Sequence, residues 1–396
     1  MTDYGEYLGL DLDEDQKMIL EMVAQLSSEL LAPAADVIDR DEAIPANVRA
    51  TLAESGLFGL RAPETFGGVD LDDSCYQFSL ATLAHGSASV ALDVLVQSSL
   101  LLEPLAKFAL DDEGISAWAE SVVSGEARGA LAWQESSNSL SNSDLKTELR
   151  TIDGEIQLSG VKNWVLGAPE ADRFLVLAKE GDYSSWFMVA ADAAGVEIGK
   201  KRTRLGMRGI SVAAVEFTNV AIAESNRIGT VGNGKEILEF ISCRAQVGLV
   251  ALATGLIAAA RDAAAQYATE RRQFKRPIAD FEAIREKLAG AESAHASAAS
   301  LLASCARLSD GGGGHDRKRL HFGMAARIQA TDLAMKVADD ALQTFGGYGY
   351  SQEYPVERFY RDARYLALAF GGNDPIRLRL ARSILPSSDS ASRKSD

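Results

Sequence analysis

Residues 343–364 decide the fold of this chain, and they read QTFGGYGYSQEYPVERFYRDAR. The glycines Gly346 and Gly347 let the backbone approach a ligand closely, and their N–H groups can meet phosphate oxygens. The second half of the run places acidic, aromatic and basic residues around Pro355. A Gly-Gly turn alone is weak evidence for a binding site. A run of this length is more specific, because a pattern that involves many positions seldom arises by chance.

This run resembles the C-terminal core of the acyl-CoA dehydrogenase family, and the resemblance extends over residues 13–385. It implies a mainly α fold with a β domain: an N-terminal helical domain, a middle β-barrel or sandwich domain and a C-terminal four-helix bundle. It also implies FAD as cofactor and an acyl-CoA or related thioester as substrate. Self-association as a dimer or tetramer and an electron-transfer flavoprotein or similar acceptor follow from the same resemblance.

Changes from helical to strand-like sequence patterns along the chain predict where the domains end. Residues 1–128 look helical, 129–230 form the β domain, 231–386 are helical again, and 387–396 form a disordered tail. Within the β domain, residues 149–158 predict a hairpin around the Asp153-Gly154 turn. Four C-terminal helices are expected at 251–272, 283–307, 317–343 and 374–385, with a flexible glycine loop at 310–314.

Composition excludes several classes of function. The net charge of −16 argues against nucleic-acid binding, and it opposes a polyanionic ligand unless basic residues are locally concentrated. No uncharged apolar run reaches 18 residues, so we expect no membrane insertion. Cys75, Cys243 and Cys305 lack metal-ligand spacing, so we expect no metal site and a cytoplasmic protein with reduced thiols.

Two segments resemble the family's phosphate-binding and adenine-binding elements. The run YATERRQF at 267–274 places Arg271 where the family meets the FAD pyrophosphate of the neighbouring subunit, with Phe274 near the adenine. Guanidinium groups bind phosphate in a bidentate manner. The alternative interpretation is a basic helix end, where an arginine interacts favourably with the helix dipole. Lys275 replaces the family's glycine. Gln343, Gly346 and Gly347 form the second element.

The β domain carries the motifs that resemble the flavin-ring contacts. Gln134 and Glu135 stand where the family has Thr-Glu, and Trp164 in the sequence KNWV matches a tryptophan that lies against the ring. A core aromatic is the alternative interpretation of Trp164. Two departures remove hydrogen-bonding groups that the family directs at the flavin: Leu140 replaces a serine and Leu166 replaces a threonine.

The catalytic base of the family is missing from its usual place. Where the family has Tyr-Glu-Gly-Thr, this chain reads Phe370-Gly371-Gly372-Asn373, so the base position is Gly371. The alternative family position, beside the arginine that corresponds to Arg244, holds Cys243. The remaining candidates are Asp374, which looks like a helix N-cap before Pro375, and Cys243, which looks like a small buried helix residue. We expect Arg244, Gly371 and Gly372 to line the acyl pocket.

Three functional interpretations remain open at this point. The chain could be a base-lacking, FAD-binding subunit of a heteromeric acyl-CoA dehydrogenase, paired with a paralogous subunit. It could instead be a divergent flavoenzyme that acts on a non-fatty-acyl substrate with a shifted base. The third interpretation is a non-catalytic binding protein that kept the fold, because a fold alone does not imply a function.

Overall fold

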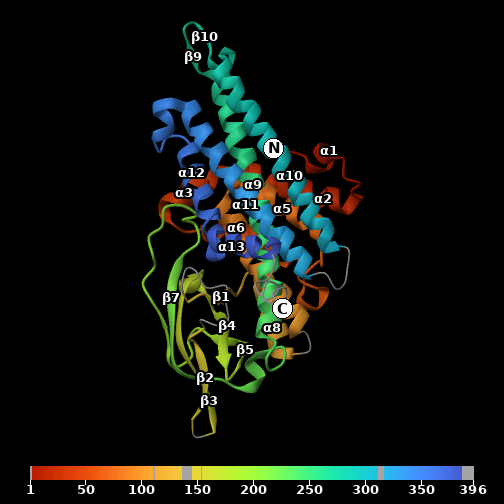
Figure 1. Cartoon of the computed structure of the whole chain (residues 1–396), viewed down its shortest axis with the longest axis vertical. Helices are drawn as coiled ribbons and strands as arrows, with labels where there is room; N and C mark the ends of the chain where they lie inside the picture. The colour runs from red at the N-terminus through yellow and green to blue at the C-terminus, as the bar shows by residue number, and fades with distance from the viewer. Residues whose placement is uncertain (1, 110–111, 136–144, 153, 311–315, 386–396) are drawn as a thin grey trace, which may run out of the picture.

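The computed structural model describes residues 2–109, 112–135, 145–152, 154–310 and 316–385. A sheet domain lies between an N-terminal and a C-terminal set of helices in the sequence, and in space it lies at one end of the packed helices (Figure 1). This arrangement confirms the predicted mainly α fold with a middle β domain. Three predictions concern residues outside the described ones: Leu140, positions 311–314 of the glycine loop and the tail at 387–396. Asp310, which was predicted in that loop, is instead the last residue of a helix.

The N-terminal part consists of short helices, several of which begin at an aspartate or serine that caps their free N–H groups. Asp13 and Gln16 form a reciprocal capping box, and Asp72, Ser87 and Asp112 cap later helices. The helices are α1 (Tyr4–Leu8), α2 (Glu14–Gln25), η1 (Leu26–Leu31), α3 (Ala32–Asp41), α4 (Ala46–Glu54), η2 (Leu57–Gly59), η3 (Glu64–Phe66), α5 (Asp73–Gly86), α6 (Ala88–Val94), η4 (Leu95–Leu102), α7 (Glu103–Phe108) and α8 (Glu113–Val123).

The middle part forms one sheet in the order β6-β7-β3-β2-β4-β5-β8, with β1 added in parallel beside β4. Its strands are β1 (Gly129–Ala132), β2 (Glu148–Ile152), β3 (Glu155–Leu166), β4 (Arg173–Glu180), β5 (Tyr183–Ala190), β6 (Val196–Ile198), β7 (Val212–Ala221) and β8 (Arg227–Ile228), with the short helices η6 (Ala168–Glu170) and η7 (Glu224–Asn226) between them. The predicted hairpin is confirmed, because β2 and β3 pair antiparallel and Ile152 lies opposite Glu155. A core of alternating apolar residues such as Phe174 and Phe217 fills one face of the sheet.

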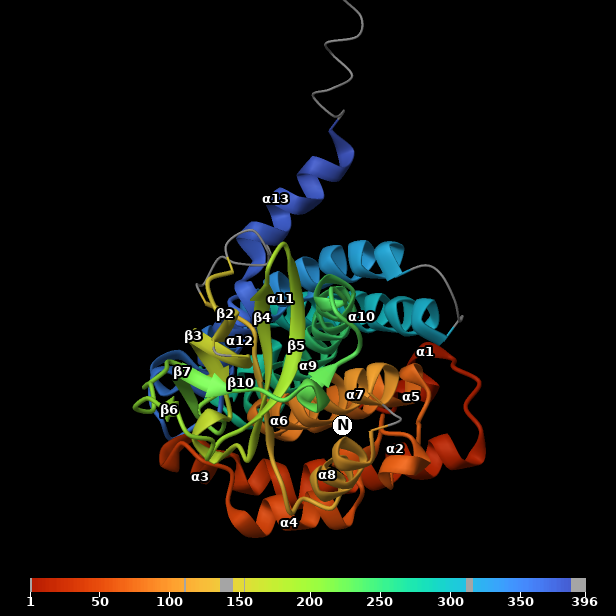
Figure 2. The ribbon, with the colours of Figure 1, turned by 90° about the horizontal axis from the view of Figure 1, so that it is seen from below.

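The C-terminal helices include one that the sequence analysis did not predict. They are α9 (Gly234–Glu270), α10 (Glu282–Asp310), α11 (Asp316–Phe345), α12 (Val356–Leu366) and α13 (Asn373–Ile384), with the hairpin strands β9 (Arg272–Gln273) and β10 (Arg276–Pro277) and the turns η8 (Ile278–Asp280), η9 (Gly346–Tyr350) and η10 (Ala369–Gly371). The missed helix α12 packs against α9 and α11, whereas α13 contacts α11 and then points away from the bundle (Figure 2).

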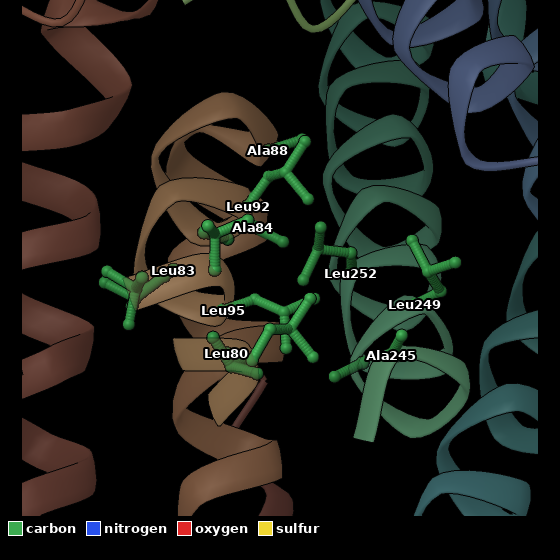
Figure 3. Packing of buried hydrophobic residues seen from close by; sticks show 14 of the residues in the cluster. Leu80, Leu83, Ala84, Ala88, Leu92, Leu95, Ala245, Leu249 and Leu252 are labelled. Carbon is green, nitrogen blue, oxygen red and sulfur yellow. The ribbon is translucent and has the colours of Figure 1, made fainter. Parts of the chain in front are cut away.

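The long helix α9 is the central element of the core. Ala245, Leu249 and Leu252 of α9 pack against apolar side chains of α5, α6 and η4, including Leu92 and Leu95 (Figure 3). Glycine is required at two points of this contact. A Cβ at position 248 would lie 2.4 Å from a methyl group of Leu95, and one at position 255 would lie 2.0 Å from the carbonyl of Ala81.

Two helical stretches are long and apolar enough to cross a membrane by length and composition, Ala88–Phe108 and Gly234–Glu270. The apolar windows of both are mostly buried inside the protein. Core helices of globular proteins pass the same test, so this finding is weak evidence for a membrane span.

Candidate active site

A cavity of about 640 Å³ lies where the sheet domain meets the helices. Its apolar wall comes from η4 and β1, through residues such as Leu100 and Leu131. Its polar wall comes from the segment between β6 and β7, from α11 and α12, and from residues 367–377. Five of the predicted site residues line this one cavity: Gln134, Trp164, Gly371, Gly372 and Asp374.

Trp164 reaches the cavity because β3 is irregular at that point. The register between β3 and β7 shifts between Lys162 and Val165, and Trp164 has a left-handed backbone with φ of 55°. Such a bulge redirects a side chain out of the regular strand pattern. The indole is 44% exposed and the guanidinium of Arg202 lies over it, 5.2 Å from the ring centre. A ring in this position can lie against a flat ligand, which the core interpretation of Trp164 would not allow.

Glu135 serves the structure rather than the cavity wall. Its carboxylate accepts hydrogen bonds from the backbone N–H groups of Thr147 and Lys146. It also forms an ion pair of 2.8 Å with Lys162, whose side chain is fully buried. Burial lowers the pKa of Lys162 to about 8, although Glu135 opposes this shift. Burial alone would raise the pKa of Glu135, but attraction to Lys162 holds it below its ordinary value. The KNWV motif contained Lys162, but its burial was not predicted.

The turn at the expected base position has an unusual backbone. Phe370, Gly371 and Gly372 all have positive φ values, of 47°, 95° and 77°. The ring of Phe370 is buried and packs edge-on against Trp133, 6.1 Å between centroids. Glycine at 371 and 372 suits this backbone, since L residues with side chains rarely adopt it.

Arg327 supports this turn by a hydrogen bond to its backbone. The sequence analysis did not predict this role. The side chain is fully buried on α11 and donates to the Ala369 carbonyl at 2.6 Å and to Gln246 Oε1 at 2.8 Å. No ion pair with a carboxylate is recorded for it among the described residues. Burial lowers its pKa to about 9. A sequence signal existed, because Arg327 lies at helical spacing from the buried residues Met324 and Thr331.

Asn373 presents an unsatisfied acceptor to the cavity. Its Nδ2 donates to the hydroxyl of Thr331 at 2.8 Å, while its buried Oδ1 has no hydrogen-bond partner. A buried amide oxygen without a partner costs about 1–3 kcal/mol unless a ligand donates to it. The cavity therefore contains a place for a hydrogen-bond donor.

The two candidate bases do not have the geometry that a base requires. Asp374 lies at the rim, its side chain is 92% exposed and it forms an ion pair of 3.0 Å with Arg377. The prediction that Asp374 caps α13 is wrong, because the helix begins at Asn373 after Gly372 and has no side-chain cap. Cys243 is buried in an apolar cluster with Met324 and Ile376, apart from the lining residues.

Arg244 also lies apart from the lining residues, although it was expected in the acyl pocket. It pairs with Glu103 at 2.6 Å and with Asp73 at 3.3 Å inside the N-terminal helices. Burial alone would lower the pKa of Arg244, but these two carboxylates raise it above its ordinary value. We therefore describe it as a buried ion-pair residue that joins α9 to α5 and α7.

The arginines that do line the cavity were not singled out from the sequence. Arg361 is held by Asp39 and Glu357, and Gly206 packs so closely on it that a Cβ there would lie 2.3 Å from the Arg361 carbonyl. Packing against Arg361 therefore requires glycine at position 206. Arg204, Arg364 and Arg377 complete the basic lining.

The remaining predicted cofactor residues lie together at the far end of the bundle. Arg271 ends α9, and its guanidinium lies over the ring of Tyr348, 5.5 Å from the centre. Phe274 at the tip of the β9–β10 hairpin is 86% exposed. Lys275 has φ of 67°, so a side chain occupies a left-handed position that glycine would adopt without strain.

Gln343, Gly346 and Gly347 are exposed beside this end of α9. A Cβ at either glycine would meet nothing within 4 Å in the protomer. Packing within the chain therefore does not require glycine at either position. The backbone of Gly346 has φ of 61°, which by itself favours glycine, whereas Gly347 has no such positive φ.

Comparison with known proteins gives a consistent result. The family models for acyl-CoA dehydrogenase match the chain with their N-terminal domain at 13–126, middle domain at 130–220 and C-terminal domain at 244–385. Benzylmalonyl-CoA dehydrogenase of Aromatoleum aromaticum is 31% identical over 95% of this chain and 100% of its own length.

Two solved structures share the fold over nearly the whole chain. Butyryl-CoA dehydrogenase from Megasphaera elsdenii has a TM-score of 0.88 and 26% identity, covering 95% of this chain and 99% of the other. A glutaryl-CoA dehydrogenase from Mycobacterium smegmatis in complex with FADH2 has a TM-score of 0.87, covers 94% of this chain and 95% of the other, and at 20% identity shows the fold alone.

Proposed function

The chain belongs to the acyl-CoA dehydrogenase family, and we propose that it is a flavoprotein oxidoreductase that introduces an α,β double bond into an acyl-CoA or related thioester. FAD, when bound, would supply the hydride acceptor for this chemistry. The observation that carries the proposal is the 640 Å³ cavity, in which Trp164 and Gln134 meet the turn at Gly371.

The flavin ring would lie in this cavity. Trp164 offers an aromatic face, and the unsatisfied Oδ1 of Asn373 can accept a hydrogen bond from a ring N–H. Leu166 lines the same wall without a hydrogen-bonding group, so the chain would hold the ring with fewer polar contacts on that side. The apolar surface of Leu100 and Leu131 is left for the acyl chain.

The pyrophosphate and adenine would be held across a subunit interface. Arg271, Phe274, Gln343, Gly346 and Gly347 are exposed or partly exposed. The β9–β10 hairpin, which carries Phe274, lies at the opposite end of α9 from the sheet domain (Figure 1). Their accessibility in a single protomer supports the proposal that they serve the cofactor of a neighbouring copy. A dimer or tetramer, and an electron-transfer flavoprotein or similar acceptor, complete the proposed system.

We further propose that the chain lacks its own catalytic base. Among the described residues that line the cavity, the carboxylates are Asp332 and Asp374, and both are paired with Arg377. A base-lacking subunit of a heteromer would show this feature, and so would an enzyme whose substrate needs no base. Co-expression with a base-containing paralogue, followed by size-exclusion chromatography, tests the first possibility.

The flavin proposal is tested with two adjacent arginines. Arg271→Met should reduce the flavin content of the purified protein, because a phosphate contact is lost. Arg272→Met is the matched control, since Arg272 is the next arginine in the chain and is exposed at the start of the hairpin, but is not assigned to the phosphate. Purified wild-type protein without bound flavin, and without uptake of added FAD, would refute the proposal.

The activity itself is tested by anaerobic titration of the flavin-loaded protein with a panel of acyl-CoA thioesters. Bleaching of the flavin absorbance by at least one thioester is the expected result, because reduction removes the oxidised flavin band. If every thioester binds without bleaching in the presence of the proposed paralogue as well, the oxidoreductase assignment is wrong.

A further inference from the structure

The interior of the cavity contains no free carboxylate among the described lining residues. The base position, Gly371, offers only backbone, and the aspartates Asp332 and Asp374 lie at the rim with side chains that are 52% and 92% exposed. Arg377 binds both of them, at 2.7 and 3.0 Å. No described residue in this cavity is therefore placed to remove an α proton as a carboxylate base.

The same cavity has an excess of positive charge. Of its four lining arginines, Arg361 and Arg377 are each neutralised by two carboxylates. Arg204 and Arg364 have no recorded ion pair with a carboxylate of the described residues. The whole chain has a net charge of −16, so this concentration of cations is local. A site of this kind attracts an anion.

Arg204 lines the cavity and keeps a charge that no carboxylate of the described residues neutralises. Its Nη2 donates to the carbonyls of Met207 and Ile210, so the backbone holds the guanidinium in place without neutralising its charge. The guanidinium lies over the ring of Tyr365, 5.4 Å from the centre, and Tyr365 also lines the cavity. Burial raises the pKa of Tyr365, so the phenol stays protonated and can donate a hydrogen bond but not act as a base.

A third cation lies behind the turn. Arg327 contacts the Ala369 carbonyl, has no exposed surface and has no recorded carboxylate partner among the described residues. In a low-dielectric interior its charge acts on the turn with little screening. The cavity that contains the base position is thus lined and backed by guanidinium groups, where the resemblance to the family leads one to expect a carboxylate.

Resting on the function proposed above, we propose that the acyl group bound here carries a carboxylate on its α carbon, as in a substituted malonyl thioester. The bond from Cα to this carboxylate breaks, CO2 leaves, and its electron pair forms the Cα=Cβ double bond. The Cβ–H bond breaks at the same time, and its hydride passes to the oxidised flavin as oxidant. One negative charge enters on the carboxylate and one leaves with the reduced flavin, and no proton is taken up or released.

This substrate class explains two features of the site: glycine at the base position and arginines that have no carboxylate partner. Glycine at 371 removes the like-charged side chain that would repel a substrate carboxylate and leaves room for it. Arg204 and Arg364 supply attraction without a bidentate clamp, since Arg204 is already engaged by two carbonyls. A clamp would stabilise the carboxylate before the bond breaks, and only interactions stronger in the transition state accelerate the step.

A matched pair of thioesters separates the contribution of the α-carboxylate to binding from the contribution of the CoA phosphates. Butyryl-CoA and ethylmalonyl-CoA differ only in the α-carboxylate and give the same product, crotonyl-CoA. We expect calorimetry to show that ethylmalonyl-CoA binds about tenfold more tightly or better. We also expect ¹³CO2 release from the labelled carboxylate to match the amount of flavin bleached, with little bleaching by butyryl-CoA.

Three variants test whether the lining arginines cause the difference in affinity between the two thioesters. Arg204→Gln and Arg364→Gln should each reduce the affinity ratio between the two thioesters by about threefold to tenfold, whereas Arg204→Lys should retain most of it. Lys200→Gln is the control, because Lys200 is an exposed cation of the same segment that does not line the cavity. Arg364 is exposed, so its variant remains informative if Arg204→Gln does not fold.

Equal affinity for the two thioesters, or an affinity ratio unchanged in both glutamine variants, would overturn the inference. Bleaching by butyryl-CoA as fast as by ethylmalonyl-CoA would do the same and would leave the proposed dehydrogenase function intact. If the protein binds no flavin, the function proposed above fails. The calorimetric comparison on the flavin-free protein still decides whether the cavity prefers the carboxylate.

Discussion

The buried ammonium of Lys162 donates to Glu135 Oε1 over 2.8 Å and to the Trp133 carbonyl over 3.2 Å. This ion pair ties the irregular part of β3, which carries Trp164, to the end of β1. Breaking a buried pair by removing one partner leaves an uncompensated charge, which costs more than replacing both partners. The Trp164 side of the cavity therefore depends on an interaction that does not itself touch the ligand.

Glu135→Ala should lower the free energy of unfolding by about 3–5 kcal/mol, because the Lys162 charge remains buried without its partner. Urea denaturation followed by circular dichroism measures this loss. The double variant Glu135→Leu with Lys162→Met should regain most of it, since no charge is left unpaired. A single variant as stable as the wild type would show that Lys162 is exposed in solution.

Gly371→Glu should restore the family's carboxylate without restoring full activity. The backbone at 371 has φ of 95°, so any side chain there costs about 1–3 kcal/mol in strain, and Leu166 still lacks a hydrogen-bonding group. Gly371→Gln has the same strain without the charge and serves as the control. Full dehydrogenase activity of the glutamate variant with butyryl-CoA in a dye-reduction assay would contradict this expectation.

The buried imidazole of His295 should make stability depend on pH in the acidic range. Burial, assisted by the nearby Arg261, lowers its pKa from 6.5 to about 4, while Tyr4 and Tyr7 pack on its ring. Between these two pH values the unfolded chain holds the proton and the folded chain does not. The free energy of unfolding should therefore fall by roughly 3 kcal/mol as the pH drops from 6.5 to 4.

Denaturation curves of His295→Gln across the same range provide the check. The amide can still accept the hydrogen bond that Arg261 directs at His295 Nδ1, but it does not titrate. This variant should show a flatter dependence on pH than the wild type. Identical slopes for the two proteins would mean that His295 is accessible to protons in the folded state.

Phe274→Ser should separate protomer stability from self-association. The ring is 86% exposed and contacts Phe281 edge-on, so the thermal midpoint of the isolated protomer should change little. Sedimentation velocity should show weaker association, and the flavin content should fall, because the tip of the hairpin is proposed to meet a neighbouring copy. Tyr183→Ser, at another exposed aromatic far from the hairpin, is the control.

Local patterns predicted much of the fold. The Asp153-Gly154 turn predicted a hairpin because the turn type and the flanking apolar residues act over a few positions, and Ile152 does pair with Glu155. The helix α12 was missed because its residues were interpreted as a ligand motif. Its buried stripe of Val356, Phe359 and Ala363 has helical spacing that could have revealed it.

The site was less predictable because it is assembled from distant segments. Arg244 and Arg204 are both arginines near apolar residues in the sequence, and only the fold decides that Arg244 meets Glu103 while Arg204 lines the cavity. The bulge that turns Trp164 outward depends on pairing with β7, roughly fifty residues later in the chain. No local pattern contains either relationship.

The helix α9 spans 37 residues, which corresponds to a rod of about 55 Å. At its start the Gly234 carbonyl accepts a hydrogen bond of 3.0 Å from the Trp186 indole of the sheet, and at its finish it carries the hairpin with Phe274. Because the glycine contacts along its middle leave no clearance, α9 holds the hairpin and its contact with the sheet at a fixed separation. The spacing between the surface proposed to meet a neighbouring copy and the sheet domain is therefore set by the length of one helix.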